Sequence, residues 1–265
     1  MRDILHMKWL WREKRATWLA ITAFGAVLAT LTVSVAWSAD PDALWKIVHD
    51  RCAPHQQQAG DPQPCAAIDL DHGVALLKDL VGVAQFLLIP TTRIAGVESP
   101  ELLTPGATNY WDYAWADRHY VEERLHQTLS RDRLGLAVNS TQGRSQNQLH
   151  IHIDCIRADV RDALRQHEAA ILPTWSPFPV TLSGHTYAAM RIQAAELGRT
   201  DPFVLVADTL PGARDAMPLQ TLVLTGAVFK DGTDGFYLLD DHADLASGDP
   251  GSGEELLDHD CAVAK

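Results

Sequence analysis

The chain has 265 residues, of which 46% are hydrophobic, and carries 22 Lys and Arg against 34 Asp and Glu. This length and apolar content suit one ordinary globular domain or two small ones. The first 39 residues hold five of the basic and only two of the acidic residues, so the remainder is strongly acidic. Binding to a nucleic-acid backbone needs a basic surface, so nucleic acid is not expected as a partner.

The first 39 residues have the pattern of a membrane anchor. Basic residues crowd the first fifteen positions, and residues 16–39 carry no charge, are mostly apolar and have a tryptophan near each end. Such a run is long enough to span a bilayer core of about 30 Å. We therefore expect residues 1–39 to form a cytoplasmic stub and a single transmembrane helix, with residues 40–265 on the outer side. A cleaved signal peptide ending near Ala36-Trp37-Ser38 is the alternative.

The next segments predict a helix, a loop and a hairpin. Residues 42–50 have the period of a short amphipathic helix, and residues 55–64 are rich in Gln, Pro and Gly, which predicts a loop. Residues 73–94 read as two apolar strands joined by a turn near Gly82, the second strand ending at Pro90.

Residues 98–106 form a connection punctuated by prolines, and residues 109–130 predict a single helix with aromatic residues on one side. Such aromatic stripes usually pack in a core. The alternative, near a lipid substrate, is that Trp111 and Trp115 help to line an acyl groove. Residues 134–138 predict a strand.

The stretch 139–155, with sequence NSTQGRSQNQLHIHIDC, carries the candidate chemistry. Its second half alternates apolar and polar residues, which predicts a half-buried strand with His150 and His152 on one face, roughly 7 Å apart. The small, polar residues 140–145 just before it form a loop suited to presenting backbone N–H groups and hydroxyls to an anion.

Three interpretations of this stretch compete. The first is a surface strand with two ordinary histidines. The second is a metal site of His150, His152 and Asp154, whose spacing resembles part of the H-x-H-x-D-H motif of metallo-β-lactamase-like hydrolases; Cys155 stands where that motif has its last histidine. The third is nucleophilic histidine chemistry on a phosphate.

The carboxy-terminal hundred residues are predicted more coarsely. Residues 157–172 predict a helix, and 203–207, 221–229 and 235–239 predict strands, the last two joined by a turn at Asp231-Gly232. Residues 241–255 are acidic and rich in glycine and read as a mobile loop. His185 is a further histidine able to reach the site, although a lone histidine is more often structural.

The four cysteines, Cys52, Cys65, Cys155 and Cys261, predict two disulfides in an exported domain, with three possible pairings. A zinc site is the alternative, but the chain has no C-x-x-C pair.

The loop and strand resemble the signature of the histidine-triad (HIT) family, an Asn/Gly/Ser loop followed by His-φ-His-φ-His. Asn139, Gly143 and Ser145 match the loop, and His150 and His152 match the last two histidines. Gln148 stands at the first. The hairpin ending in Ile-Pro resembles a hairpin of the same family, with Gln85 at the position of a fourth histidine. The resemblance implies that His150 is the nucleophile.

Longer runs resemble the bacterial CDP-diacylglycerol pyrophosphatases, a membrane-anchored branch of the HIT-like superfamily. These runs are CAPHQQQAGDPQPCA, LLIPTTRIAGVESPELL, GRSQNQLHIHIDCIRADVRDAL and the ending DHDC. The resemblance implies an α+β fold with an antiparallel HIT-like sheet and flanking helices, a C-terminal extension over roughly residues 173–265, and a location in the bacterial inner membrane with the catalytic domain in the periplasm. It implies no cofactor and no metal.

The activity implied is hydrolysis of CDP-diacylglycerol, a lipid nucleotide held in the membrane, to phosphatidate and CMP. His150 would attack the cytidylyl phosphorus and His152 would assist proton transfer. Substrate and phosphate would be bound by the five further residues Gln148, Ser145, Asn139, Gln85 and Arg93. Arg144 and Arg157 are further candidates for charge near the phosphates. A membrane-anchored domain that binds a nucleotide or lipid headgroup without turnover is the non-enzymatic alternative.

Overall fold

The computed structural model describes residues 40–264, which fold as one unit. The predicted transmembrane helix lies outside these residues. Within them, no helix combines the length and apolar character needed to cross a bilayer.

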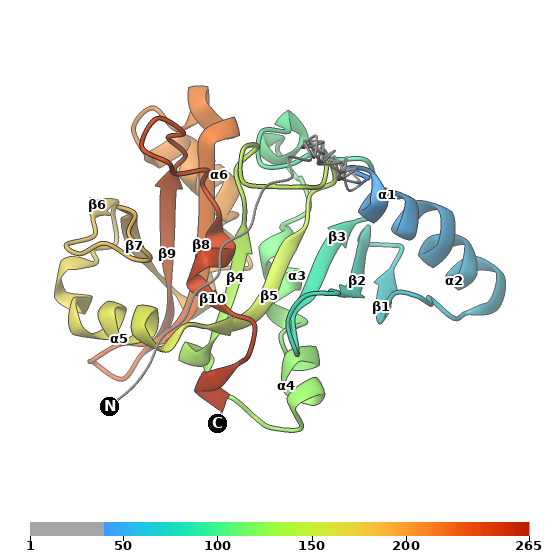
Figure 1. Ribbon diagram of the computed structural model, residues 1–265, viewed down its shortest axis with the longest axis horizontal. Helices are drawn as coiled ribbons and strands as arrows, with labels where there is room; N and C mark the ends of the chain where they lie inside the picture. The colour runs from blue at the N-terminus through green and yellow to red at the C-terminus, as the bar shows by residue number, and fades with distance from the viewer. Residues whose placement is uncertain (1–39, 265) are drawn as a thin grey trace, which may run out of the picture. The chain divides into compact units, whose positions relative to one another are not determined.

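The centre of the fold is one antiparallel sheet with the strand order β1-β2-β3-β5-β4-β8-β9-β7-β6, and β10 pairs with β5 (Figure 1). The strands are β1 (Ala67–Asp69), β2 (Val74–Lys78), β3 (Phe86–Pro90), β4 (Leu134–Val138), β5 (Ile151–Ile156), β6 (Ser176–Pro177), β7 (Ala188–Gln193), β8 (Gln220–Val228), β9 (Asp234–His242) and β10 (Leu257–Asp258). The α-helices are α1 (Ala43–Ile47), α2 (Ala53–Ala59), α3 (Tyr110–Ala116), α4 (His119–Leu125), α5 (Ala158–Gln166) and α6 (Pro202–Thr209). The predicted α+β class with a large antiparallel sheet is confirmed.

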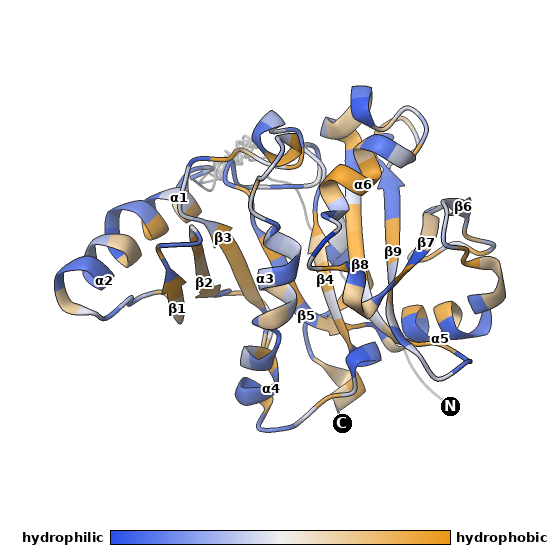
Figure 2. Cartoon of the chain, turned by 180° about the vertical axis from the view of Figure 1, so that it is seen from behind, coloured by the Kyte–Doolittle hydropathy of each residue, from blue (hydrophilic) through white to orange (hydrophobic). Residues whose placement is uncertain are grey.

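The two faces of β5 are buried by different parts of the chain. Leu149, Ile151 and Ile153 belong to the main core cluster, together with Trp111 of α3 and Phe203 of α6. Because side chains alternate along a strand, the opposite face carries His152 and Asp154. Figure 2 shows the middle strands largely orange and α4 largely blue, as expected for a sheet covered by amphipathic helices.

Two disulfides staple this unit, which confirms that prediction. Cys52 is bonded to Cys65, 13 residues apart, and Cys155 is bonded to Cys261, 106 residues apart. The first crosslinks the α1–α2 region to the start of β1. The second attaches the carboxy-terminal segment to β5, beside which β10 pairs as an antiparallel strand. The residues that flank β10 include Glu254 and His259, which reach the face of β5 that carries the histidines.

Several predicted elements are wrong in kind or extent. Residues 203–207 form helix α6 instead of a strand, because Asp201 caps the first turn by accepting a hydrogen bond from the Phe203 N–H and Pro202 occupies the first helical position. These start signals outweigh the β-branched content. Residues 109–130 form two short helices, since the chain breaks at Asp117 and Arg118.

Two predicted loops are also more regular than expected. Residues 55–59 are the end of α2, which stops at Gly60 in the left-handed conformation, so the predicted loop begins later. Of the acidic stretch 241–255, the first residues extend β9. The rest is held by a bridge between Asp244 and Asp249 and by a 3₁₀ turn at Gly253–Leu256.

Candidate active site

The face of β5 that points away from the main core carries the two predicted histidines. His150 precedes the first residue of the strand, and its ring centroid lies 4.8 Å from that of His152. Both histidines are buried, with exposed fractions of 8% and 4%. The prediction that alternation brings them to one face is confirmed.

His150 is fixed in one tautomer by the backbone. Its Nδ1 lies 2.7 Å from the carbonyl oxygen of Gln148, and because a carbonyl only accepts, Nδ1 carries the proton. Nε2 of the neutral ring therefore presents a lone pair, and no hydrogen-bond partner for it occurs in residues 40–264. Burial, reinforced by the neighbouring His152, lowers the pKa of His150 to about 4. The ring is neutral at physiological pH and is chemically suited to act as a nucleophile.

His152 is a buried imidazole without an aligned partner. Neither ring nitrogen makes a hydrogen bond within the described chain, although Nε2 lies 3.2 Å from Glu254 Oε1. Burial lowers the pKa of this histidine as well. A buried polar group left unpaired carries a desolvation cost, and such groups are often completed by a ligand.

Glu254 reaches the histidines from the carboxy-terminal segment and is held there by Asn139. The Asn139 amide donates to Glu254 Oε1 at 2.7 Å and accepts from the Gly253 N–H at 2.9 Å. A Cβ at Gly253 would lie 3.0 Å from Val223 and 3.1 Å from Ala137, so a glycine permits the close approach to the sheet. Asn139, predicted to bind phosphate, thus positions an acidic side chain.

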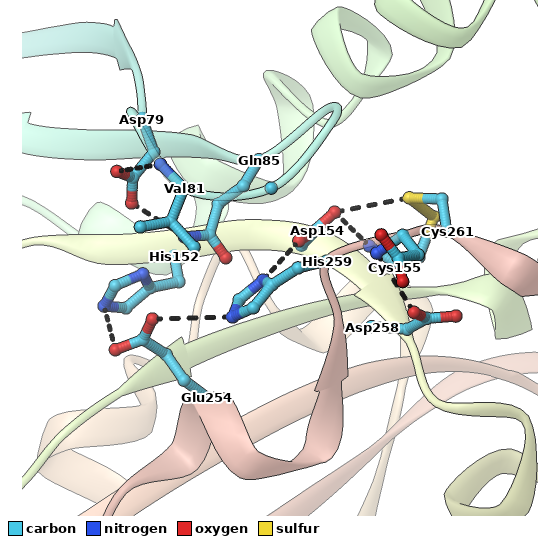
Figure 3. Close-up of polar contacts among 12 residues, drawn as sticks. Asp79, Val81, Gln85, His152, Asp154, Cys155, Glu254, Asp258, His259 and Cys261 are labelled. Atoms are coloured by element: carbon cyan, nitrogen blue, oxygen red, sulfur yellow. Dashed lines mark hydrogen bonds and ion pairs between the residues drawn. A yellow bond between two sulfur atoms is a disulfide. The ribbon is translucent and has the colours of Figure 1, made fainter.

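His259 lies on the other side of Glu254, as Figure 3 shows. Its Nδ1 is 3.0 Å from Asp154 Oδ2, and its Nε2 is 4.0 Å from Glu254 Oε2. The hydrogen bond to the Asp154 carboxylate raises the pKa of His259 above its usual value. His150 and His259 are therefore pushed in opposite directions, one toward the neutral ring and one toward the imidazolium.

The β2–β3 turn holds the segment that bears His259. The Val83 N–H donates to the His259 carbonyl at 2.8 Å. Gly82, with φ of +73°, has its Cα side facing Asp154 and His259, where a Cβ would meet the Asp154 carboxylate at 3.3 Å. On the opposite side of the segment, the Cys155–Cys261 disulfide attaches it to β5. The position of His259 thus depends on contacts between segments more than 100 residues apart in sequence.

The two glutamines predicted at family histidine positions are both buried, but they differ in role. Gln148 donates from its amide nitrogen to the carbonyls of Pro90 and Thr92, which ties the start of β5 to the end of β3. Gln85 lies on the histidine face of the sheet and donates to Asp79 at 2.7 Å, and its buried Oε1 has no hydrogen-bond partner among residues 40–264. Of the two, Gln85 is nearer to Asp154 and His259.

The prediction that residues 140–145 present free backbone N–H groups to an anion is corrected by the structure, because most of these groups already donate hydrogen bonds within the protein. The N–H groups of Gln142 and Gly143 donate to Ser140 Oγ, and those of Thr141 and Arg144 donate to backbone carbonyls. These four donors are not free for a phosphate. Ser145 is exposed and follows them.

The three arginines considered for phosphate binding are paired with carboxylates elsewhere. Arg93 pairs with Asp42 and stacks on Trp45, Arg144 forms a bidentate pair with Glu98, and Arg157 pairs with Asp159. None of these contacts reaches the histidines. His185 does not join the site either, because its Nδ1 contacts Glu255 and Asp249.

The proposed metal trio His150, His152 and Asp154 does not converge. Within the described residues, two groups bring three potential ligand atoms within 4.8 Å of one another, and this trio is neither of them. One group contains Cys155 and Cys261, whose sulfurs are bonded to each other. Asp154 instead faces His259.

Sequence reasoning missed Glu254 and His259 as members of the site. Glu254 was placed in a stretch read as a mobile loop, and no periodicity marks either residue. The available signal was the ending DHDC, in which a histidine beside two aspartates stands two residues from a cysteine. A pairing of that cysteine with Cys155 would have placed this ending next to β5.

The chain matches one known family over all of the described residues. The family model described as CDP-diacylglycerol pyrophosphatase matches residues 39–265. The chain belongs to the CDP-diacylglycerol pyrophosphatase family. One curated relative, the CDP-diacylglycerol pyrophosphatase of Yersinia pestis, is 44% identical over 222 residues, which cover 84% of each chain. The family's members are hydrolases, and the predicted resemblance to the CDP-diacylglycerol pyrophosphatases is confirmed.

The pairing of His259 with Asp154 predicts a specific response to mutation. In the unaltered protein, His259 should lose its proton only as the pH rises through a value above 6.5. Asp154→Asn should move this midpoint to lower pH, because the carboxylate that stabilises the imidazolium is gone. Histidine ring signals in NMR titrations measure the midpoint, and Asp260→Asn, an exposed neighbour, is the control. An unchanged midpoint in Asp154→Asn would contradict the assigned pair.

Proposed function

We propose that this protein hydrolyses CDP-diacylglycerol to phosphatidate and CMP through a covalent nucleotidyl-histidine at His150. Family membership supplies the substrate. The single observation that supports the mechanism is the hydrogen bond from His150 Nδ1 to the Gln148 carbonyl, which leaves the Nε2 lone pair for attack. A neutral imidazole avoids the repulsion that an anionic nucleophile meets at a negatively charged phosphoanhydride.

In the first half-reaction, His150 Nε2 forms a bond to the cytidylyl phosphorus as the bond from that phosphorus to the bridging oxygen breaks. The electron pair leaves with phosphatidate, which stays in the membrane. The ring becomes positively charged, and its Nδ1–H donates more strongly to the Gln148 carbonyl. In the second half-reaction, water attacks the same phosphorus, CMP is released and His150 is restored.

His152 and His259 stabilise the negative charge that develops on oxygen atoms during these steps. His152 donates a hydrogen bond to an oxygen of the transferred phosphoryl group, which satisfies a buried ring that is otherwise unpaired. His259, held as an imidazolium by Asp154, gives its proton to the departing bridging oxygen, and the neutral ring then accepts a proton from the attacking water. His259 thus acts as the general acid, a role that Gln85 and Gln148 cannot perform because an amide does not release a proton. The Ser145 hydroxyl and the unpaired Gln85 Oε1 remain predicted substrate contacts.

We further propose that the domain is HIT-like and that residues 1–39 anchor it in the bacterial inner membrane, with residues 40–265 in the periplasm. The two disulfides support an oxidising compartment. The predicted extension from about residue 173 belongs to the same sheet, through β7, β8 and β9, and it carries Glu254 and His259.

Membrane association has a second basis in the β2–β3 turn. Leu80, Val81 and Val83 have exposed fractions of 102%, 53% and 49%, although they stand next to the segment that bears His259. Lys78 Nζ closes the turn by donating hydrogen bonds to the carbonyls of Asp79 and Gly82. We propose that these three side chains enter the bilayer interface or contact acyl chains while the phosphoanhydride reaches His150.

The nucleophile assignment predicts the effect of two substitutions. His150→Ala should abolish turnover of CDP-diacylglycerol while leaving the fold intact, whereas His152→Ala should reduce kcat less completely. The release of CMP in mixed micelles is the measurement, with His119→Ala, on exposed α4, as the matched control. Near-normal hydrolysis by His150→Ala would rule out this mechanism.

The exposed turn predicts a difference between substrate forms. Burying one leucine contributes about 1.5–3 kcal/mol, so Leu80→Asp should lower kcat/KM on vesicle-embedded CDP-diacylglycerol by roughly 10-fold or more. Activity on a water-soluble, short-chain CDP-diacylglycerol should change little, since the histidines are untouched. Leu245→Asp, at another exposed leucine, is the control. An equal loss on both substrate forms would contradict a membrane role for the turn.

A further inference from the structure

A second group of titratable side chains lies outside the site described above. Potential ligand atoms of His185, Asp241 and Asp249 lie within 4.8 Å of one another. The three residues come from separate segments: His185 from the turn before β7, Asp241 from β9, and Asp249 from the bridge that follows β9. Glu255 joins them, with its Oε1 2.9 Å from His185 Nδ1.

The carboxylates of this group are buried and incompletely paired. Asp241 is 3% exposed, and its buried Oδ2 has no hydrogen-bond partner within residues 40–264. The neighbouring Asp240 is equally buried and has an unpaired Oδ1. Both residues, with Asp249, line a cavity of about 690 Å³ that opens to solvent. A small ion therefore has a route to the unpaired oxygens.

The charges in this region do not balance. Three carboxylates, from Asp241, Asp249 and Glu255, lie around His185, and no Lys or Arg occurs among the described residues that line the cavity. Burial and the charge of Asp249 raise the pKa of Asp241 to about 7. Burying carboxylates without a cation is unfavourable, and proteins relieve it by protonation, pairing or metal coordination.

We propose that His185, Asp241 and Asp249 bind a divalent transition-metal ion, Mn²⁺ or Zn²⁺, with Glu255 as a fourth ligand or as the partner of a bound water. One imidazole with two or three carboxylates is a donor set suited to these ions, whose bonds to nitrogen and oxygen are about 2.0–2.2 Å. His185 Nδ1 now contacts Glu255. To bind the ion, Nδ1 must be deprotonated so that its lone pair can coordinate the metal. The proton is either released to solvent or carried on Nε2 in the other tautomer of the ring.

The ion would stabilise the segment that completes the active site. Asp249 accepts from the Gly251 N–H at 2.9 Å, and the carbonyls of Pro250 and Gly251 accept from Ser140. Glu254 follows three residues later and reaches His152. A metal at Asp249 thus supports the conformation that presents Glu254, without touching the reacting phosphorus.

Direct binding of Mn²⁺ to the full-length, metal-stripped protein tests this proposal. Electron paramagnetic resonance of free Mn²⁺ should reveal about one saturable site per chain. Asp241→Asn, Asp249→Asn and His185→Gln should each weaken this binding at least 10-fold. His152→Ala and the exposed Asp71→Asn should bind as the unaltered protein does, because they lie outside the group. The proposal would be overturned if no saturable binding were observed, or if the three variants bound Mn²⁺ as tightly as the unaltered protein.

Thermal unfolding distinguishes lost ligation from lost folding. Mn²⁺ at about 100 times Kd should raise the Tm of the unaltered protein by roughly 5–10 °C. Without metal, the Asp241→Asn variant should have a Tm equal to or higher than that of the unaltered protein, because the substitution removes a carboxylate that the neighbouring carboxylates repel. Mn²⁺ should no longer raise the Tm of this variant. A Tm rise that survives in Asp241→Asn would contradict the site. Neither measurement depends on CDP-diacylglycerol hydrolysis, so failure here leaves the proposed function intact.

Discussion

The pairing of Asp154 with His259 joins the two parts of the chain on which the active site depends. Asp154 lies on the central strand β5, and His259 lies in a segment that the Cys155–Cys261 disulfide attaches to the same strand. A carboxylate with an exposed fraction of 0% at its side chain needs a partner, and the imidazolium supplies it. Glu254 and β10 lie on the same segment, so this contact, together with the disulfide and the β10 pairing, holds the segment against β5.

The site separates two protonation states within one small region. Burial keeps His150 neutral, as the proposed attack on phosphorus requires, while the hydrogen bond to Asp154 favours the protonated form of His259. Glu254 lies between His152 and His259, and it is oriented by Asn139. In the proposed mechanism, a nucleophile and a charged partner for the leaving oxygen thus operate at the same pH, because their environments shift their pKa values in opposite directions.

Local sequence patterns predicted the features of the fold that are determined by residues close together in the sequence. Alternation along residues 149–153 placed the two histidines on one face, and turn residues near Gly82 placed the β2–β3 hairpin. Contacts between distant segments escaped this reasoning: no period links His259 to Asp154, or Asn139 to Glu254. Arginines 93, 144 and 157 looked available for phosphate because their carboxylate partners are distant in sequence or unmarked by any motif. The strand assigned to residues 203–207 failed because Asp201 and Pro202 start a helix there.

The central claim is that His150 carries the nucleotide between the two half-reactions. Mass spectrometry of the protein, quenched in acid-free denaturant within milliseconds of mixing with CDP-diacylglycerol, tests this directly. The account predicts a peptide containing His150 whose mass is increased by one cytidylyl group, and no such peptide from His150→Ala. Rapid turnover with no adduct on any histidine, or an adduct on His152 instead of His150, would contradict it.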